Sequence, residues 1–175
     1  MKTIINGKIY INTEYTQIIN GEEIDLPSPK TIHQLAMGKL LLVLCDHVDA
    51  HQPGEIYRVP FDVIFEENFN VLQPDFLFIS RQNESTVQDV VCGIPDLVIE
   101  VVSPEMLNID TVIKKGIYEH YGVPECWLVY PEKVCVEIYT LNNGKYSLQA
   151  SFSGDERVQS HVLDQLSFPV NVIAQ

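Results

Sequence analysis

Residues 93–105 read GIPDLVIEVVSPE and place a glutamate inside an otherwise apolar, β-branched run. Such a run is typical of a strand that is covered on both faces. A carboxylate inside it is costly to bury unless a cation or hydrogen-bond donors compensate its charge. Glu100 is therefore the strongest single candidate for a functional residue.

The segments around this strand predict an α/β sheet of mixed direction, with helices covering its faces. Apolar residues recur at helical spacing over 29–44 and 110–121, and Ser28-Pro29 is typical of a helix start. Asp110 is expected to cap the second helix and Gly122 to end it. The expected strands are short ones up to about Asp25, then 57–66, 75–80, 96–102, 126–130, 134–141 and 146–152, with a hairpin turn at Asn142-Asn143-Gly144.

Length and composition indicate one globular domain over residues 1–175, because 46 % of the residues are apolar and no repeat or linker interrupts the chain. Lys and Arg number 11 against 24 Asp and Glu, so the net charge is 11 − 24 = −13. This charge disfavours non-specific electrostatic binding to nucleic acid or to an anionic membrane. The N-terminus lacks the pattern of a secretory signal, and no apolar run is long enough to span a bilayer. The four cysteines form no C-x-x-C pair, so we expect reduced thiols and a cytoplasmic protein.

Geometry decides which acidic residue can act together with Glu100. Asp96 shares a strand face with it, but four residues at about 3.3 Å each separate the two by roughly 13 Å. If strands 75–80 and 96–102 pair antiparallel, Asp75 lies level with Glu100 at about 5 Å. Two carboxylates at that distance repel unless a cation lies between them, and carboxylates with water form the usual Mg²⁺ site.

The compensating cation could also be a lysine of the following helix. Lys114 and Tyr118 stand at helical spacing and could face back over the end of the sheet, while Lys115 points aside. A purely structural interpretation also exists, in which Glu100 pairs with Lys114 or Arg58 as a structural salt bridge.

The other candidates have structural interpretations as well. Asp75 and Asp96 each follow a proline, where aspartate often caps a turn. His33 lies in the first helix and could be an ordinary core histidine.

Several segments together resemble a large bacterial family of restriction-endonuclease-like proteins of unknown function. The similarity runs in register from about Ser28 to Tyr139. It rests on QPDFLFIS (73–80), GIPDLVIEVVSPE (93–105), the Asp110-x3-Lys114-x3-Tyr118 spacing and GVPECWLVYP (122–131), with support from 28–41 and 57–67.

The resemblance implies the fold of the PD-(D/E)-x-K nuclease superfamily, whose core is helix, three-stranded meander, helix and strand. The strands that follow would form an added C-terminal hairpin. It further implies that Asp75 and Glu100 hold Mg²⁺ or Mn²⁺, with the Val101 backbone carbonyl as a further ligand. Lys114 would then orient and activate the attacking water.

The resemblance extends to Asp96 and His33 and departs from the superfamily pattern at Val102. Asp96 matches an acidic position of the family without an assigned role, and His33 could line the same pocket. The residue two after Glu100 is Val102 and not the lysine of the superfamily pattern, so the cationic role would pass to Lys114.

The expected function is metal-dependent hydrolysis of DNA phosphodiester bonds. The alternative is a nuclease-fold module that has lost catalysis and serves in binding or interaction, which Val102 and the acidic surface favour. A weaker option is a hydrolase of smaller phosphate esters. The C-terminal strands offer an edge through which a homodimer could pair. No glycine-rich loop indicates an organic cofactor.

Overall fold

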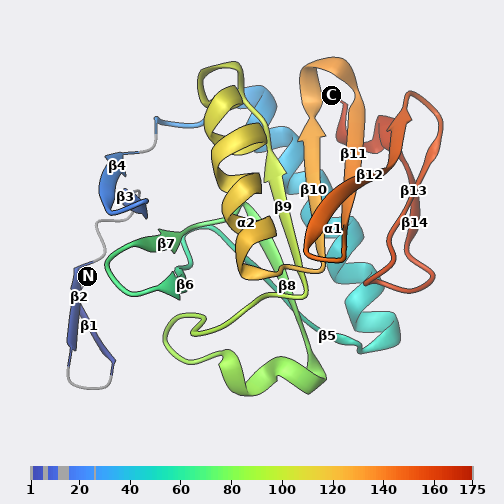
Figure 1. The fold of residues 1–175 in the computed structure, drawn as a ribbon. Coiled ribbons are helices and arrows are strands. Elements are labelled where there is room, and N and C mark those ends of the chain that lie inside the picture. Colours follow the sequence, from blue (N-terminus) through green and yellow to red (C-terminus); the bar gives the residue numbers. More distant parts are fainter. Residues whose placement is uncertain (1, 6–7, 12–15, 26, 175) are drawn as a thin grey trace.

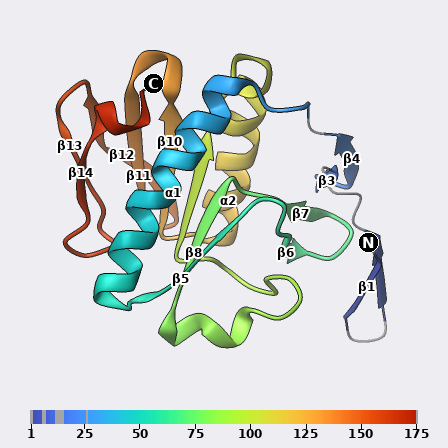
Figure 2. The same ribbon diagram turned by 180° about the vertical axis from the view of Figure 1, so that it is seen from behind.

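The computed structural model describes residues 2–5, 8–11, 16–25 and 27–174. Its centre is a six-stranded mixed sheet between two helices. α1 (Thr31–His51) covers one face of the sheet and α2 (Lys115–Tyr121) covers the other (Figure 1 and, from behind, Figure 2). The centre of the molecule therefore has three layers, as expected for strands that are apolar on both faces.

The strands of the central sheet follow one another in an order close to that of the sequence. β5, β8 and β9 form an antiparallel meander, β10 lies parallel to β9 after the crossover through α2, and β11 and β12 add a hairpin. Helix, meander, helix and strand thus succeed one another as predicted. The bounds are β5 (Gly54–Arg58), β8 (Phe76–Ser80), β9 (Leu97–Val101), β10 (Glu125–Tyr130), β11 (Cys135–Asn142) and β12 (Lys145–Ser153).

Smaller elements flank this centre on two sides. A four-stranded sheet with the order β4-β3-β7-β6 lies on one side, and the pair β13 and β14 lies on the other (Figure 1). The expected short strands before Asp25 are present, although residues 1, 6–7 and 12–15 of that segment lie outside the described residues. The bounds are β1 (Lys2–Ile5), β2 (Lys8–Ile11), β3 (Thr16–Ile19), β4 (Glu22–Asp25), β6 (Val63–Glu66), β7 (Asn70–Leu72), β13 (Arg157–Gln159) and β14 (Ser167–Pro169), with 3-10 turns at Arg81–Thr86, Pro104–Met106, Pro131–Lys133 and Val170–Ile173.

Alternation along the central strands divides the core into two layers. Phe76 and Ile99 pack in the layer on the α1 side, while Leu77 and Val98 pack in the layer that contains Tyr118 of α2. Each fully buried side chain of this kind contributes about 1.5–3 kcal/mol to folding. The two layers fix the strand faces and therefore which side chains can meet at the ends of β8 and β9.

The first helix differs from its predicted bounds at both ends. It begins at Thr31 and not Pro29, with Lys30 in the capping position and no side-chain cap, so Ser28 does not have the predicted role. It continues to His51 because the buried face extends through His47 and Val48. Gln52 ends it in a left-handed conformation directly before Pro53.

The strand expected over 57–66 is two strands. β5 ends at Arg58 and belongs to the central sheet, whereas β6 starts at Val63 and belongs to the four-stranded sheet. Pro60 has no backbone N–H, so a continuous ladder through this position is disfavoured. The chain leaves the central sheet here, beside the carboxyl end of β5.

The second helix contains an irregular first part. Ile109–Lys114 form a π-helical segment, and regular α2 follows from Lys115. Gly122 ends the helix as predicted, with φ +89° and its N–H bonded to the carbonyls of the last turn. Asp110 does not cap the helix, contrary to the prediction, since it lies within the π-helical segment and is buried. Wide turns of this kind recur at functional sites.

The hairpin and the cysteines agree with expectation. Asn143 and Gly144 both have positive φ, as a two-residue β-hairpin turn requires. All four cysteines are free. Among the described residues, no helix combines the length and apolar character needed to cross a membrane.

Candidate active site

Asp75 and Glu100 lie at the adjacent ends of two antiparallel strands. Phe76 pairs with Ile99 and Leu77 with Val98, so the register places Asp75 level with Glu100. This confirms the predicted antiparallel pairing of the two segments. Because Leu77 and Val98 face α2, the two carboxylates also start from that face of the sheet.

Glu100 is almost completely buried, with 1 % of its surface exposed. Its Oε1 lies 2.7 Å from the Lys114 ammonium and also accepts a hydrogen bond from the Tyr118 hydroxyl. Burial raises the pKa of Glu100 to about 8, against the attraction of Lys114 and with the help of the nearby Asp110 and Asp75 carboxylates. Without a further cation, this carboxyl group holds its proton at neutral pH.

Lys114 is the cation around which the carboxylates gather. Its side chain is 3 % exposed, and its ammonium lies 3.7 Å from Asp110 Oδ1 in addition to its contact with Glu100. Burial alone would lower the pKa of Lys114, but Glu100, Asp110 and Asp75 outweigh it and raise that pKa to about 12. Lys114 is therefore protonated at neutral pH, where it can donate hydrogen bonds and cannot act as a general base.

Asp75 links the two strands with the first helix. Its Oδ2 accepts the backbone N–H of Val101 at 2.7 Å and lies 3.4 Å from His33 Nε2 of α1. Burial lowers the pKa of His33, but the Asp75 and Asp110 carboxylates more than offset this and raise it above the usual value. This shift favours the protonated imidazole beside the carboxylates, and His33 lines the same cavity.

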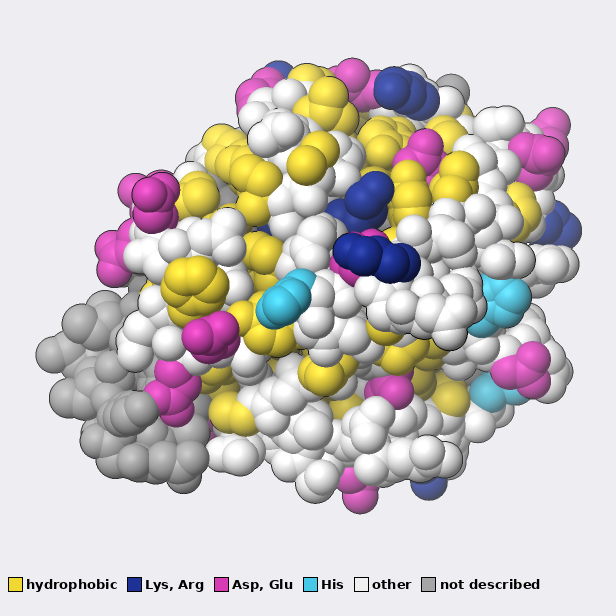
Figure 3. Space-filling model, viewed as in Figure 1, with side chains coloured by type: hydrophobic (Ala, Val, Ile, Leu, Met, Phe, Trp, Pro, Cys, Tyr) yellow, Lys and Arg dark blue, Asp and Glu magenta, His cyan; other side chains and the backbone are white. Residues whose placement is uncertain are grey.

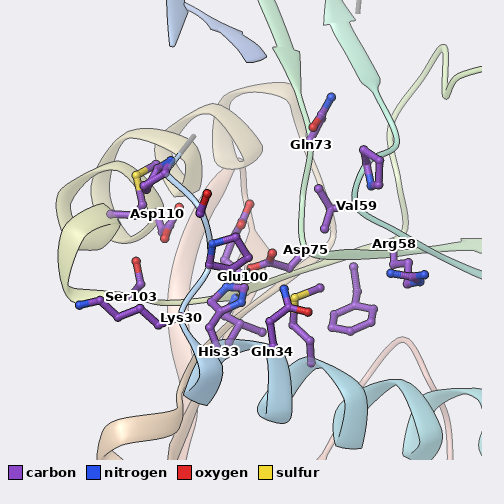
Figure 4. Close-up of a pocket in the computed structure, with 18 of the residues that line it drawn as sticks. Lys30, His33, Gln34, Arg58, Val59, Gln73, Asp75, Glu100, Ser103 and Asp110 are labelled. Atoms are coloured by element: carbon purple, nitrogen blue, oxygen red, sulfur yellow. Dashed lines mark hydrogen bonds and ion pairs between the residues drawn. The ribbon is translucent and has the colours of Figure 1, made fainter. Parts of the chain in front are cut away.

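These groups line a cavity of about 670 Å³ at the end of the sheet. Figure 4 shows Asp75 and Glu100 near its centre, with His33 and Gln34 rising from α1. The rim carries two further cations, Lys30 and Arg58, which lie on opposite sides of the carboxylates in this view. The cavity has the size of a small-molecule site.

The donor set of this cavity fits one hard divalent cation. In the described parts of the chain, no three His, Cys, Asp or Glu side chains converge as a ready-made metal site. A metal here would rest on Asp75 and Glu100 with water, an arrangement common for Mg²⁺. Hydrogen bonds from the described residues leave Asp75 Oδ1 and Glu100 Oε2 without a donor. Burial is the main cause of the raised Glu100 pKa, and a divalent ion would offset both this burial and the repulsion from Asp110 and Asp75.

Asp96 lies apart from this group. Its Oδ2 accepts the Ser80 N–H at 2.7 Å and its Oδ1 accepts the Asn83 amide at 2.8 Å. Asp96 does not line the cavity. Its carboxylate orders the turn after β8, which agrees with the structural interpretation of an aspartate that follows a proline.

Asp96→Asn is accordingly expected to lower the free energy of unfolding by about 1–2 kcal/mol, because an amide NH₂ would face one of the two donors. Any affinity of the cavity for a divalent ion should stay at the wild-type level, because Asp96 does not line it. Denaturant unfolding and a metal titration of the same preparation test both statements. A variant of normal stability that binds metal more weakly would assign Asp96 to the site.

Asp110 and Tyr118 also belong to the site, although the sequence pattern predicts no catalytic or metal-binding role for either residue. The sequence predicts a helix cap at Asp110. Its spacing of four residues from Lys114 also indicates that the two side chains share one helix face, and this is the signal for a common site. Tyr118 adds a second donor on the Glu100 oxygen that Lys114 contacts. Together they fix Lys114 and Glu100 in a network of buried polar groups.

The raised pKa of Glu100 predicts how stability depends on pH in the metal-free protein. The folded chain holds this proton up to about pH 8, whereas the unfolded chain loses it near 4.5. The free energy of unfolding should therefore fall as pH rises between these values, by at most about 1.4 kcal/mol per pH unit. Asp110, whose pKa burial raises to about 6, adds to the fall at the acidic end.

Urea unfolding in EDTA from pH 4.5 to 8 measures this dependence. Glu100→Gln should flatten the profile, since glutamine does not titrate. Parallel profiles for wild type and variant would contradict the assigned protonation of Glu100.

The mixed sheet and its two covering helices define a restriction-endonuclease-like fold, with a cluster of acids and one lysine at the strand ends. The sequence model of the Uma2 family, described as "Putative restriction endonuclease", matches residues 10–171, so the chain belongs to that family. A solved structure of a "putative nuclease belonging to DUF820" from Anabaena variabilis ATCC 29413 superposes with a TM-score of 0.75 at 16 % identity, over 93 % of this chain and 90 % of that one. At this identity the likeness shows the fold. No curated protein matches the sequence.

Proposed function

We propose that this protein is a Mg²⁺- or Mn²⁺-dependent endonuclease that hydrolyses DNA phosphodiester bonds. The observation that carries the proposal is the convergence of Asp75, Glu100 and Lys114 in one cavity at the ends of two paired strands. Membership of a family described as "Putative restriction endonuclease" supports the reaction class.

Hydrolysis needs an activated water and compensation of the charge that develops on the phosphoryl oxygens. Asp75 and Glu100 would hold the ion, with the Val101 carbonyl as a proposed further ligand. When bound, the ion lowers the pKa of a coordinated water and polarises the phosphoryl group.

Lys114 has an electrostatic role in this scheme. Because its ammonium stays protonated, it donates a hydrogen bond to the attacking water or to a phosphoryl oxygen and stabilises the transition state. Asp110 and Tyr118 act on either side of it: Asp110 orients the ammonium and Tyr118 holds Glu100 Oε1 in place. The Lys114 ammonium lies 2.7 Å from Glu100 Oε1. Lys114 can therefore supply the cationic group that Val102 lacks.

Nicking of supercoiled plasmid by the full chain tests the proposal. Conversion to the open-circular form is expected with Mg²⁺ or Mn²⁺ and is expected to stop in EDTA. Absence of nicking with either ion, from protein that is folded by circular dichroism, would favour the alternative of a non-catalytic binding module.

A further inference from the structure

The reacting phosphate has to enter the cavity, because the groups that would act on it lie below the surface. Glu100 and Lys114 are 1 % and 2 % exposed. A cavity of about 670 Å³ matches the space that a small ligand fills. Specific duplex recognition instead buries about 1,000–2,500 Å² of protein surface in an extended interface.

The cations of the cavity are mostly committed to carboxylates. Lys30 pairs with Glu105, His33 with Asp75 and Lys114 with Glu100. Arg58 is exposed and, within the ranges that the structure describes, makes no ion pair or side-chain hydrogen bond. One uncommitted guanidinium can neutralise about one phosphate, whereas duplex-binding proteins typically neutralise about 6–10.

The face of the molecule on the α2 side offers no substitute for these missing contacts (Figure 3). On the face drawn in Figure 3, basic side chains are scattered among acidic ones and form no continuous stripe. The chain as a whole carries a charge of −13. Long-range attraction of a duplex is therefore absent, and recognition has to come from the cavity itself.

An apolar wall extends the cavity on the side where Arg58 stands. It is formed by Met37 and Leu41 of α1 and by Val59 and Pro60 directly after β5. The flat faces of nucleobases pack well on apolar surfaces of this kind. In a duplex those faces are stacked inside, so a base reaches such a wall only when it is unpaired.

Building on the proposed function, we propose that the cavity binds a short unpaired segment of DNA. Arg58 binds a phosphate next to the scissile one, and the wall of Met37, Leu41, Val59 and Pro60 contacts a base. The enzyme then acts on single strands, flaps or melted stretches in preference to intact duplex.

Binding without metal separates this inference from catalysis. Fluorescence anisotropy in EDTA would compare a labelled oligothymidylate with a hairpin duplex of equal length over a series of salt concentrations. Arg58→Gln would be measured beside Arg81→Gln, a matched control whose guanidinium contacts Gln52 outside the cavity. Cleavage of both probes in Mg²⁺ and Mn²⁺ would be followed in parallel.

The wild-type protein should prefer the single strand, with a slope of log affinity against log salt of about −0.7 to −1.4, as one or two phosphate contacts give. Arg58→Gln should weaken binding about tenfold and reduce the slope by about 0.7, while Arg81→Gln should change neither. Tighter binding of the duplex, or equal behaviour of the two variants, would overturn the inference.

The two proposals fail in distinguishable ways. Arg58-dependent binding of the single strand without cleavage by either ion would overturn hydrolysis and retain the binding mode. Equal cleavage of both probes with no effect of Arg58→Gln would retain hydrolysis and overturn the binding mode.

Discussion

Lys114→Met is expected to slow DNA cleavage by about 10²- to 10³-fold, the usual effect of removing one pre-organised donor from a developing oxyanion. The loss should fall on kcat and leave KM nearly unchanged, because the ammonium acts on the transition state and lies too deep to attract DNA. Methionine keeps the unbranched apolar stem of lysine and lacks only the ammonium, so the comparison isolates that group.

The neighbouring lysine provides a matched control. Lys115 lies over the ring of Tyr139 and away from the cavity, so Lys115→Met should cleave at the wild-type rate. Single-turnover cleavage of the same labelled DNA by both variants measures the difference. If the cleavage rate falls equally in the two variants, Lys114 matters only for folding. If both variants cleave at the wild-type rate, Lys114 has no role in the reaction.

Asp75→Asn and Glu100→Gln are each expected to lower cleavage by at least about 10³-fold, because both carboxylates would hold one ion that neither can hold alone. Residues that act as a unit have non-additive effects, so the double variant should be no slower than either single one. Both substitutions preserve shape. Glu100→Gln also replaces a carboxyl group that is already protonated in the metal-free protein, so folding should be largely retained.

Glu137→Gln serves as the control for these acids. Glu137 lies on β11 of the same sheet, accepts hydrogen bonds from two tyrosine hydroxyls and does not line the cavity. Initial rates of plasmid nicking compare the wild type with the two single variants, the double variant and Glu137→Gln. Additive losses from Asp75 and Glu100, or a comparable loss from Glu137→Gln, would contradict a shared ion at the ends of β8 and β9.

The arrangement of the two acids was predictable because it follows from local rules. A strand of residues that are apolar on both faces has no ordinary place for a glutamate, and a period of two fixes its face. Antiparallel pairing with the preceding strand then leaves only Asp75 level with Glu100. Lys114 could be assigned because its position on the following helix matched the resemblance, and a helix placed there reaches the same end of the sheet.

Features that depend on tertiary packing were not predictable in the same way. Asp110 at the start of a helical pattern is typical of a cap, and only the π-helical segment turns it into the cavity beside Lys114. The interruption after Arg58 was signalled by Pro60, yet the destination of the next strand depends on the separate four-stranded sheet. Asp96 matches an acidic position of the family, but its carboxylate accepts hydrogen bonds from the local turn and does not reach the cavity.

We propose that Asp75 and Glu100 together hold one divalent ion. Calorimetric titration of Mn²⁺ and Mg²⁺ into the wild-type protein and Glu100→Gln tests it most directly. We expect one ion bound per chain in the wild type and none in the variant, with protons released on binding because Glu100 must ionise. Absence of binding to the wild type at millimolar concentrations, or equal binding by the two proteins, would leave Glu100 and Lys114 as a buried structural pair with no part in metal binding.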